Sequence, residues 1–84
     1  MNVALRVGQL LEVGREHFGM TTSAEVVALE VGDLLYVVEA TNVCQAKAAR
    51  LSDGKVFSIV SMFSGWDVDT SGVPMSQTYV EVPL

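Results

Sequence analysis

The stretch VALRVGQLLEVGRE, Val3–Glu16, returns 24 residues later as VALEVGDLLYVVEA, Val27–Ala40. Eight of the fourteen positions are identical, and each copy sets a glycine between two apolar segments. A weaker third copy follows at Leu51–Val60. Repetition on this scale is typical of stacked β units, although a valine-rich chain would also make any two β-rich arms around a glycine look alike. Both explanations indicate β structure around the glycines.

The size of the chain and its apolar content are in conflict. The 84 residues suffice for one domain, residues 1–84, which would bury about 60–65% of its unfolded surface. Hydrophobic residues make up 50% of the chain and charged residues only 18%, against about 25% charged in an average soluble domain. A core this small cannot hold every apolar side chain, so part of the surplus is expected on the surface. Large exposed apolar patches usually mark interfaces.

Short segments rich in β-branched residues, with glycines between them, predict a mainly β fold built as a small antiparallel barrel. We expect strands at residues 3–7, 10–13, 34–38, 43–51, 55–62 and 79–82, with a bend or bulge at Gly8. The polar residues 14–23 are expected to form a long irregular linker. Asp53-Gly54 predicts a two-residue hairpin turn in which both positions have positive φ.

Two segments allow a short helix as the alternative to a strand. Thr22 and Glu25 match a capping box, which would begin a helix over residues 23–31, but the match to the first copy favours a strand. In residues 43–51, small residues alternate with polar ones, which favours a strand that points Cys44, Ala46 and Ala48 inward. The same segment also has high helix propensity.

From Val31 onward the chain resembles an SH3 domain. VGDLLYVVEA, Val31–Ala40, is similar to the glycine–aspartate turn and next strand of that family, and AARLSDGKVF, Ala48–Phe57, is similar to its third strand and distal hairpin. The residues Gly72-Val73-Pro74 and Tyr79-Val80-Glu81 are similar to its ending, so the resemblance covers about residues 31–82. It implies an SH3-like barrel. SH3 domains hold proline-rich peptides in aromatic grooves, but only Pro74 and Tyr79 match groove residues here.

Several function classes are not expected. The net charge is −5 and the five basic residues are scattered, which argues against nucleic-acid binding. The single cysteine, Cys44, cannot form an intrachain disulfide. No signal peptide and no membrane-spanning apolar run is recognised, which predicts a cytoplasmic or virion location. Paired carboxylates, nucleophile triads and phosphate-binding glycine loops are not recognised either, so we expect no enzyme and no cofactor.

One motif resembles a metal site. Asp67, Asp69, Ser71 and Gly72 spell D-x-D-x-S-G, the spacing with which a calcium loop presents oxygen ligands. The final glutamate of such a loop would fall at Thr78. A solvated acidic turn is the alternative, and we expect no metal.

The remaining candidates are interface residues. Trp66 could anchor a contact or close the barrel floor, and His17, Phe18 and Met20 are expected to form an apolar loop tip. Together with Pro74 and Tyr79, they predict a protein-binding module. The leading hypothesis is a structural subunit that self-associates into a homo-oligomer or decorates a larger particle, such as a virus particle. The alternative is a small regulatory or inhibitory protein that docks on one partner.

Overall fold

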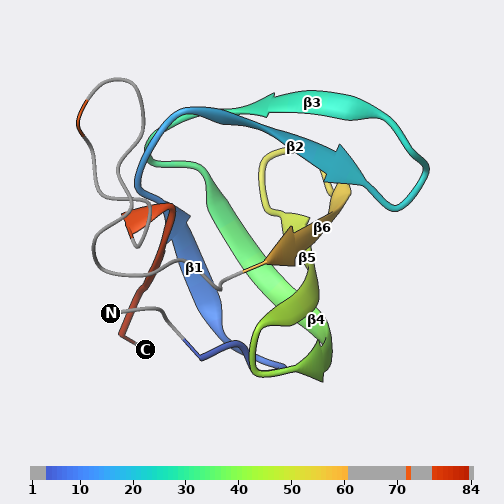
Figure 1. The fold of residues 1–84 in the computed structure, drawn as a ribbon, viewed down its shortest axis with the longest axis vertical. Helices are drawn as coiled ribbons and strands as arrows, with labels where there is room; N and C mark the ends of the chain where they lie inside the picture. The colour runs from blue at the N-terminus through green and yellow to red at the C-terminus, as the bar shows by residue number, and fades with distance from the viewer. Residues whose placement is uncertain (1–3, 61–71, 73–76, 84) are drawn as a thin grey trace.

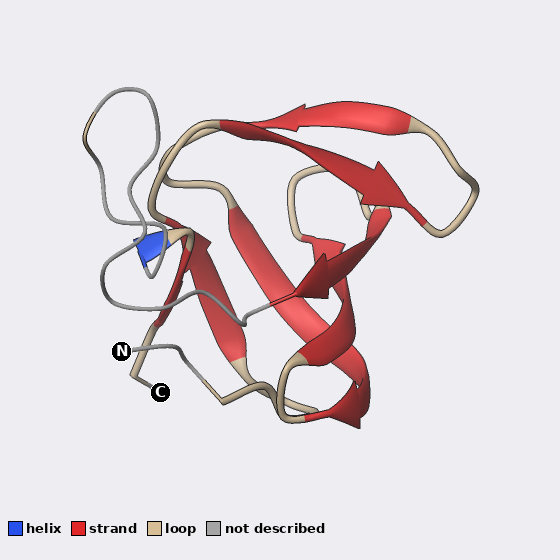
Figure 2. Ribbon diagram, in the orientation of Figure 1, coloured by secondary structure: helices blue, strands red, loops and turns tan. Residues whose placement is uncertain are grey.

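The chain forms a curled antiparallel β-sheet (Figures 1 and 2). The computed structural model describes residues 4–60, 72 and 77–83. Its strands are β1 Leu10–Val13, β2 His17–Thr21, β3 Val26–Leu29, β4 Leu34–Asn42, β5 Gln45–Arg50, β6 Val56–Val60 and β7 Tyr79–Glu81. The seven strands lie in the order β3-β2-β6-β5-β4-β1-β7. No α-helix occurs in these residues, and the piece coloured as helix in Figure 2 is a 3₁₀ turn at Gln77. The predicted mainly β, barrel-like fold is confirmed.

The inner face of the curled sheet carries the core. Successive side chains of a strand point to opposite faces, so alternate residues of each strand are buried. Ala46 and Ala48 point inward, as predicted, whereas Cys44 lies in the β4–β5 turn and is half-buried. The core consists of Leu5, Leu11, Val13, Leu29, Leu35, Val37, Ala46, Ala48, Phe57, Ile59 and Tyr79.

The first two copies of the repeat pair with each other. Strands β1 and β4 are antiparallel, and Leu11 lies opposite Leu35, which occupies the same position in the second copy. The Gly8 amide donates to the Val37 carbonyl at 2.9 Å, and the equivalent Gly32 amide donates to the Val13 carbonyl at 2.9 Å. These matched contacts relate the two copies by an approximate two-fold axis through the Leu11–Leu35 pair.

The same β-turn precedes both strands. Residues 6–9 and 30–33 are each closed by a hydrogen bond from the fourth amide to the first carbonyl, at 3.4 and 3.0 Å. The third residues are Gly8 and Gly32, with φ of 88° and 95°, which is the type II turn and explains the glycine. The side chain of the fourth residue, Gln9 or Asp33, accepts from the amide of the first.

The third copy follows the same local pattern. In all three copies the glycine has positive φ, and the residues three and five positions later are buried. These buried residues are Leu11 and Val13, Leu35 and Val37, and Phe57 and Ile59. The repeat therefore encodes a positive-φ glycine followed by a strand with its second and fourth residues in the core.

Two expectations about the first part of the chain are wrong. Residues 4–7 are not a strand. The type II turn at residues 6–9 includes Arg6 and Val7, and the Ala4 carbonyl accepts a hydrogen bond from the Gln9 side chain instead of from a neighbouring strand. The expected irregular linker contains β2. Gly19 lies in that strand. This position requires glycine, because an added Cβ would come within 2.8 Å of Leu29 Cδ1 and 2.9 Å of Phe57 Cδ1.

The two strand-or-helix alternatives are both resolved as strands, β3 and β5. Thr21, not Thr22, caps the turn between β2 and β3, and its hydroxyl accepts from the Ser23 and Glu25 amides. The expected β5–β6 hairpin is present, but the expected two-residue turn is wrong. Residues 51–54 form a four-residue loop in which only Gly54 has positive φ, at 75°.

Candidate protein-interaction surface

The outward face of the β2–β3 hairpin is apolar and exposed. We call Phe18, Met20, Val26 and Ala28 the hairpin surface. Phe18 lies opposite Ala28 and Met20 lies opposite Val26, so the four side chains share one face. The exposed fractions of Phe18, Met20 and Val26 are 77%, 47% and 60%. In Figure 1 the hairpin of β2 and β3 arches over the other strands.

The turn at the end of the hairpin has a strained residue. The Ala24 amide donates to the Thr21 carbonyl at 3.0 Å and the Thr21 amide donates to the Glu25 carbonyl at 2.8 Å, so three residues connect the strands. Ala24 has a φ of 63°, in the left-handed region that favours glycine. This three-residue loop fixes the register that places Met20 opposite Val26.

The inner side of the hairpin is attached to β7 through a histidine. His17 Nδ1 lies 2.8 Å from the Arg15 carbonyl, so Nδ1 carries the proton, and His17 Nε2 accepts from the Tyr79 hydroxyl at 3.0 Å. The two rings meet edge to face. Burial lowers the pKa of His17, and the charge of Arg15 lowers it further, against the effect of the bond to the carbonyl. Burial raises the pKa of Tyr79 to about 12.

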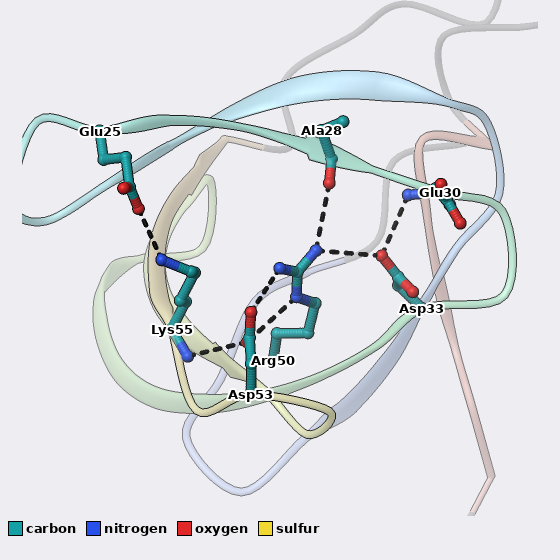
Figure 3. Close-up of polar contacts among 7 residues, drawn as sticks. All are labelled: Glu25, Ala28, Glu30, Asp33, Arg50, Asp53 and Lys55. Carbon is teal, nitrogen blue, oxygen red and sulfur yellow. Dashed lines mark hydrogen bonds and ion pairs between the residues drawn. The ribbon is translucent and has the colours of Figure 1, made fainter.

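Arg50 holds the outer strand of the hairpin against the β5–β6 loop (Figure 3). Its guanidinium donates to the Ala28 carbonyl at 3.1 Å and forms an ion pair with Asp33 at 3.4 Å. Two further bonds, at 3.1 and 2.5 Å, bind both oxygens of Asp53, and the guanidinium also lies over the Phe57 ring. The bond from Arg50 holds the pKa of Asp53 down at about 2. Arg50 therefore binds one carbonyl of the β3 edge, and the apolar side chains on the outward face of the hairpin stay exposed.

A shallow hollow lies beside Phe18 at the base of the hairpin. Its volume is about 420 Å³, and it is lined by Arg15, Glu16, His17, Phe18 and Ala28. A second hollow of about 460 Å³ lies at the tip, where the Lys55–Glu25 ion pair at 2.7 Å contributes to its wall. The first hollow could receive a side chain of a partner that covers Phe18.

A second apolar area lies on the outward face of the sheet. Leu10 pairs with Tyr36, Tyr36 with Ala49, and Ala49 with Val56, so an apolar row crosses four strands. Tyr36 is 42% exposed. Leu34 on β4 and Val80 on β7 flank this row and are also exposed. We call Leu10, Leu34, Tyr36 and Val80 the sheet surface.

The structure brings together some of the residues predicted from the sequence. Phe18 and Met20 share the hairpin surface, but they lie on a strand and not at a loop tip. His17 is half-buried on the other face, and Tyr79 is buried beneath it. The other predicted residues, Trp66, Pro74, Asp67, Asp69 and Ser71, lie outside the described residues.

Sequence reasoning missed Val26 and Ala28 as surface residues. The segment VVAL was assigned to a strand, but without the register of the hairpin the outward positions could not be chosen.

Within residues 4–60, 72 and 77–83, no group of three or more His, Cys, Asp or Glu side chains is placed to hold a metal ion. In that same part of the chain, no helix is long and apolar enough to span a membrane.

Comparison with known proteins gives no relative. No family model, no curated protein and no solved structure matches the chain. The resemblance to SH3 domains therefore stays a prediction from the sequence.

Proposed function

We propose that this chain is a non-catalytic protein–protein interaction module that serves as a structural subunit of a larger assembly. The hairpin surface is the contact. The observation that supports this proposal most directly is the exposure of Phe18, Met20 and Val26 in one cross-strand register. An exposed apolar patch of this kind is typical of a surface that another protein covers.

The energy available at the hairpin surface fits this role. Burying one large apolar side chain contributes about 1.5–3 kcal/mol, so covering Phe18 and its neighbours contributes several times RT. The hairpin is held in place by the His17–Tyr79 bond and by Arg50. A partner would therefore meet an ordered surface, and little ordering of the hairpin would oppose binding.

The test is a selection of binding peptides from a random phage-displayed library against the immobilised intact chain. A chain with Phe18→Ser and Met20→Thr is the matched control, because both residues are exposed and their replacement leaves the core intact. We expect enriched peptides that bind the wild-type chain and not the control. Enrichment of peptides that bind both chains equally would contradict the proposal.

Self-association through the sheet surface is the second form of the assembly proposal. The apolar row from Leu10 through Tyr36 to Val56 favours it, since two copies can share one apolar area around a two-fold axis. Light scattering coupled to size exclusion over a wide concentration range tests it, with Tyr36→Lys as the variant. An oligomer that Tyr36→Lys dissociates supports self-association, and a monomer at every concentration argues against it.

A further inference from the structure

We infer that the occupant of the hairpin surface is a different protein, which presents an apolar segment with a lysine or arginine at one end. This inference rests on the proposed function and names its partner by chemistry. The observations are the two glutamates at the base of the hairpin and the distribution of positive charge over the described residues.

Glu16 and Glu30 stand at one end of the hairpin surface. The β2–β3 ladder ends with the pair His17–Leu29, and these glutamates are the next residue on each chain. Both are exposed, and neither has an ion-pair partner among the described residues. In Figure 3 the Glu30 backbone amide donates to Asp33, and no contact of the Glu30 carboxylate is drawn. The apolar strip is thus followed by two available negative charges.

The two carboxylates favour a cation. Like charges on neighbouring strands repel each other, and a cation placed near both removes that repulsion while it gains attraction from each. The hollow beside Phe18 is lined by Glu16 and by Arg15, whose guanidinium donates to Thr78. An apolar side chain seated there would bring the next residue of the partner to the glutamates. A lysine or arginine at that position would form a charge-assisted hydrogen bond.

A second copy of this chain does not supply that cation. The hairpin surface carries Phe18, Met20, Val26 and Ala28, with the exposed Glu16 and Glu30 at its end, so two such surfaces would bring together apolar side chains and the negative charges that follow them. The Lys and Arg side chains of the described residues already have partners within the chain. The ion pairs are Arg6–Glu81, Lys47–Glu39, Arg50–Asp33, Arg50–Asp53 and Lys55–Glu25, and Arg15 donates a hydrogen bond to Thr78. Electrostatic complementarity therefore selects a basic partner.

The test extends the phage-display selection to a third chain, Glu16→Gln with Glu30→Gln, which keeps Phe18 and Met20. Both glutamates are exposed, so this chain is expected to fold like the wild type, and circular dichroism checks that it does. We expect peptides selected on the wild-type chain to carry Lys or Arg beside apolar residues. We also expect that preference to disappear on the Gln chain, and binding of the basic peptides to weaken about tenfold there and at high salt.

The outcomes separate the two proposals. Peptides that require Phe18 but show no preference for Lys or Arg would overturn the inference about the partner and leave the proposed function standing. Peptides that require Phe18 and keep their basic preference on the Gln chain would overturn it as well. If no peptide requires Phe18, both proposals fail.

Discussion

Leu11 and Leu35 occupy the same position in two copies of one sequence motif, and they lie directly opposite each other in the β1–β4 ladder. Neither side chain is exposed at all. The hydrogen bonds on each side of the pair match as well, Gly8 to Val37 and Gly32 to Val13, both at 2.9 Å. The repeat therefore acts in the fold as a pair of arms around an approximate two-fold axis. Strand β2 lies between the two copies along the chain and β3 begins the second copy, so the proposed contact surface spans the junction between them.

Leu11→Ala and Leu35→Ala should destabilise the chain to a similar extent. Each substitution removes a fully buried side chain from an equivalent place, and such changes cost about 2–5 kcal/mol. Urea unfolding followed by circular dichroism measures the two losses. Leu34→Ala is the control, because this neighbour lies on the exposed face and should cost much less. A large loss for one leucine with none for the other would contradict the two-fold relationship.

Ala24→Gly should stabilise the chain by about 1 kcal/mol. Ala24 has a φ of 63°, and this left-handed conformation costs a residue with a Cβ more than it costs glycine. Thermal melting measures the change. Ala28→Gly is the matched control, since Ala28 lies within β3 and has no positive φ, so glycine there should destabilise the strand. Destabilisation by both substitutions would show that the turn has another geometry.

Asp53→Asn should remove part of the acid sensitivity of the fold. The bonds from Arg50 lower the pKa of Asp53 from 3.8 to about 2, so the unfolded chain binds a proton at this position more readily than the folded one. The stability that Asp53 contributes is thus present above about pH 4 and is lost as the pH falls towards 2. Urea midpoints across this range should fall less steeply for Asp53→Asn than for the wild type. Equal slopes would contradict the pairing with Arg50.

His17 should give a second pH dependence near neutrality. Burial lowers its pKa below 6.5 in the folded chain, so below that pH the unfolded chain takes up the proton first and stability falls. The contribution of His17 is fully present above pH 6.5 and decreases as the pH falls through the lowered pKa. Urea midpoints from pH 7.5 down to 5 should decline in the wild type and stay flatter for His17→Gln. The slope decides this test, because the substitution also removes the bond to Tyr79.

The sequence was sufficient for the fold class because the signals that define it are local. The glycine of each copy, and the apolar residues three and five positions after it, predict a turn and a strand without knowledge of the partner strand. The inward positions of Ala46 and Ala48 in β5 follow in the same way, because small and polar residues alternate there with a period of two. Pairing of Leu11 with Leu35 could not be read from the repeat, because equal spacing is compatible with stacking as well as with antiparallel pairing.

The parts that sequence reasoning missed depend on contacts distant in the chain. Gly19 resembles a linker residue until Leu29 and Phe57 are seen to leave no room for a Cβ. His17 resembles an exposed loop residue until Tyr79, 62 residues away, is seen to bind it. The hairpin surface likewise needs the register of β2 against β3, which sets Val26 beside Met20.

The central claim is that the hairpin surface binds a partner protein. Its most direct test is the affinity of a phage-selected peptide for the intact chain, measured by fluorescence anisotropy, against Phe18→Ser and a matched control, Val7→Ser. Val7 is 63% exposed in a turn outside the hairpin, so its substitution removes a similar apolar group from another surface. We predict that Phe18→Ser weakens binding at least about tenfold and that Val7→Ser leaves it unchanged. Equal affinity for Phe18→Ser and the wild type would contradict the claim.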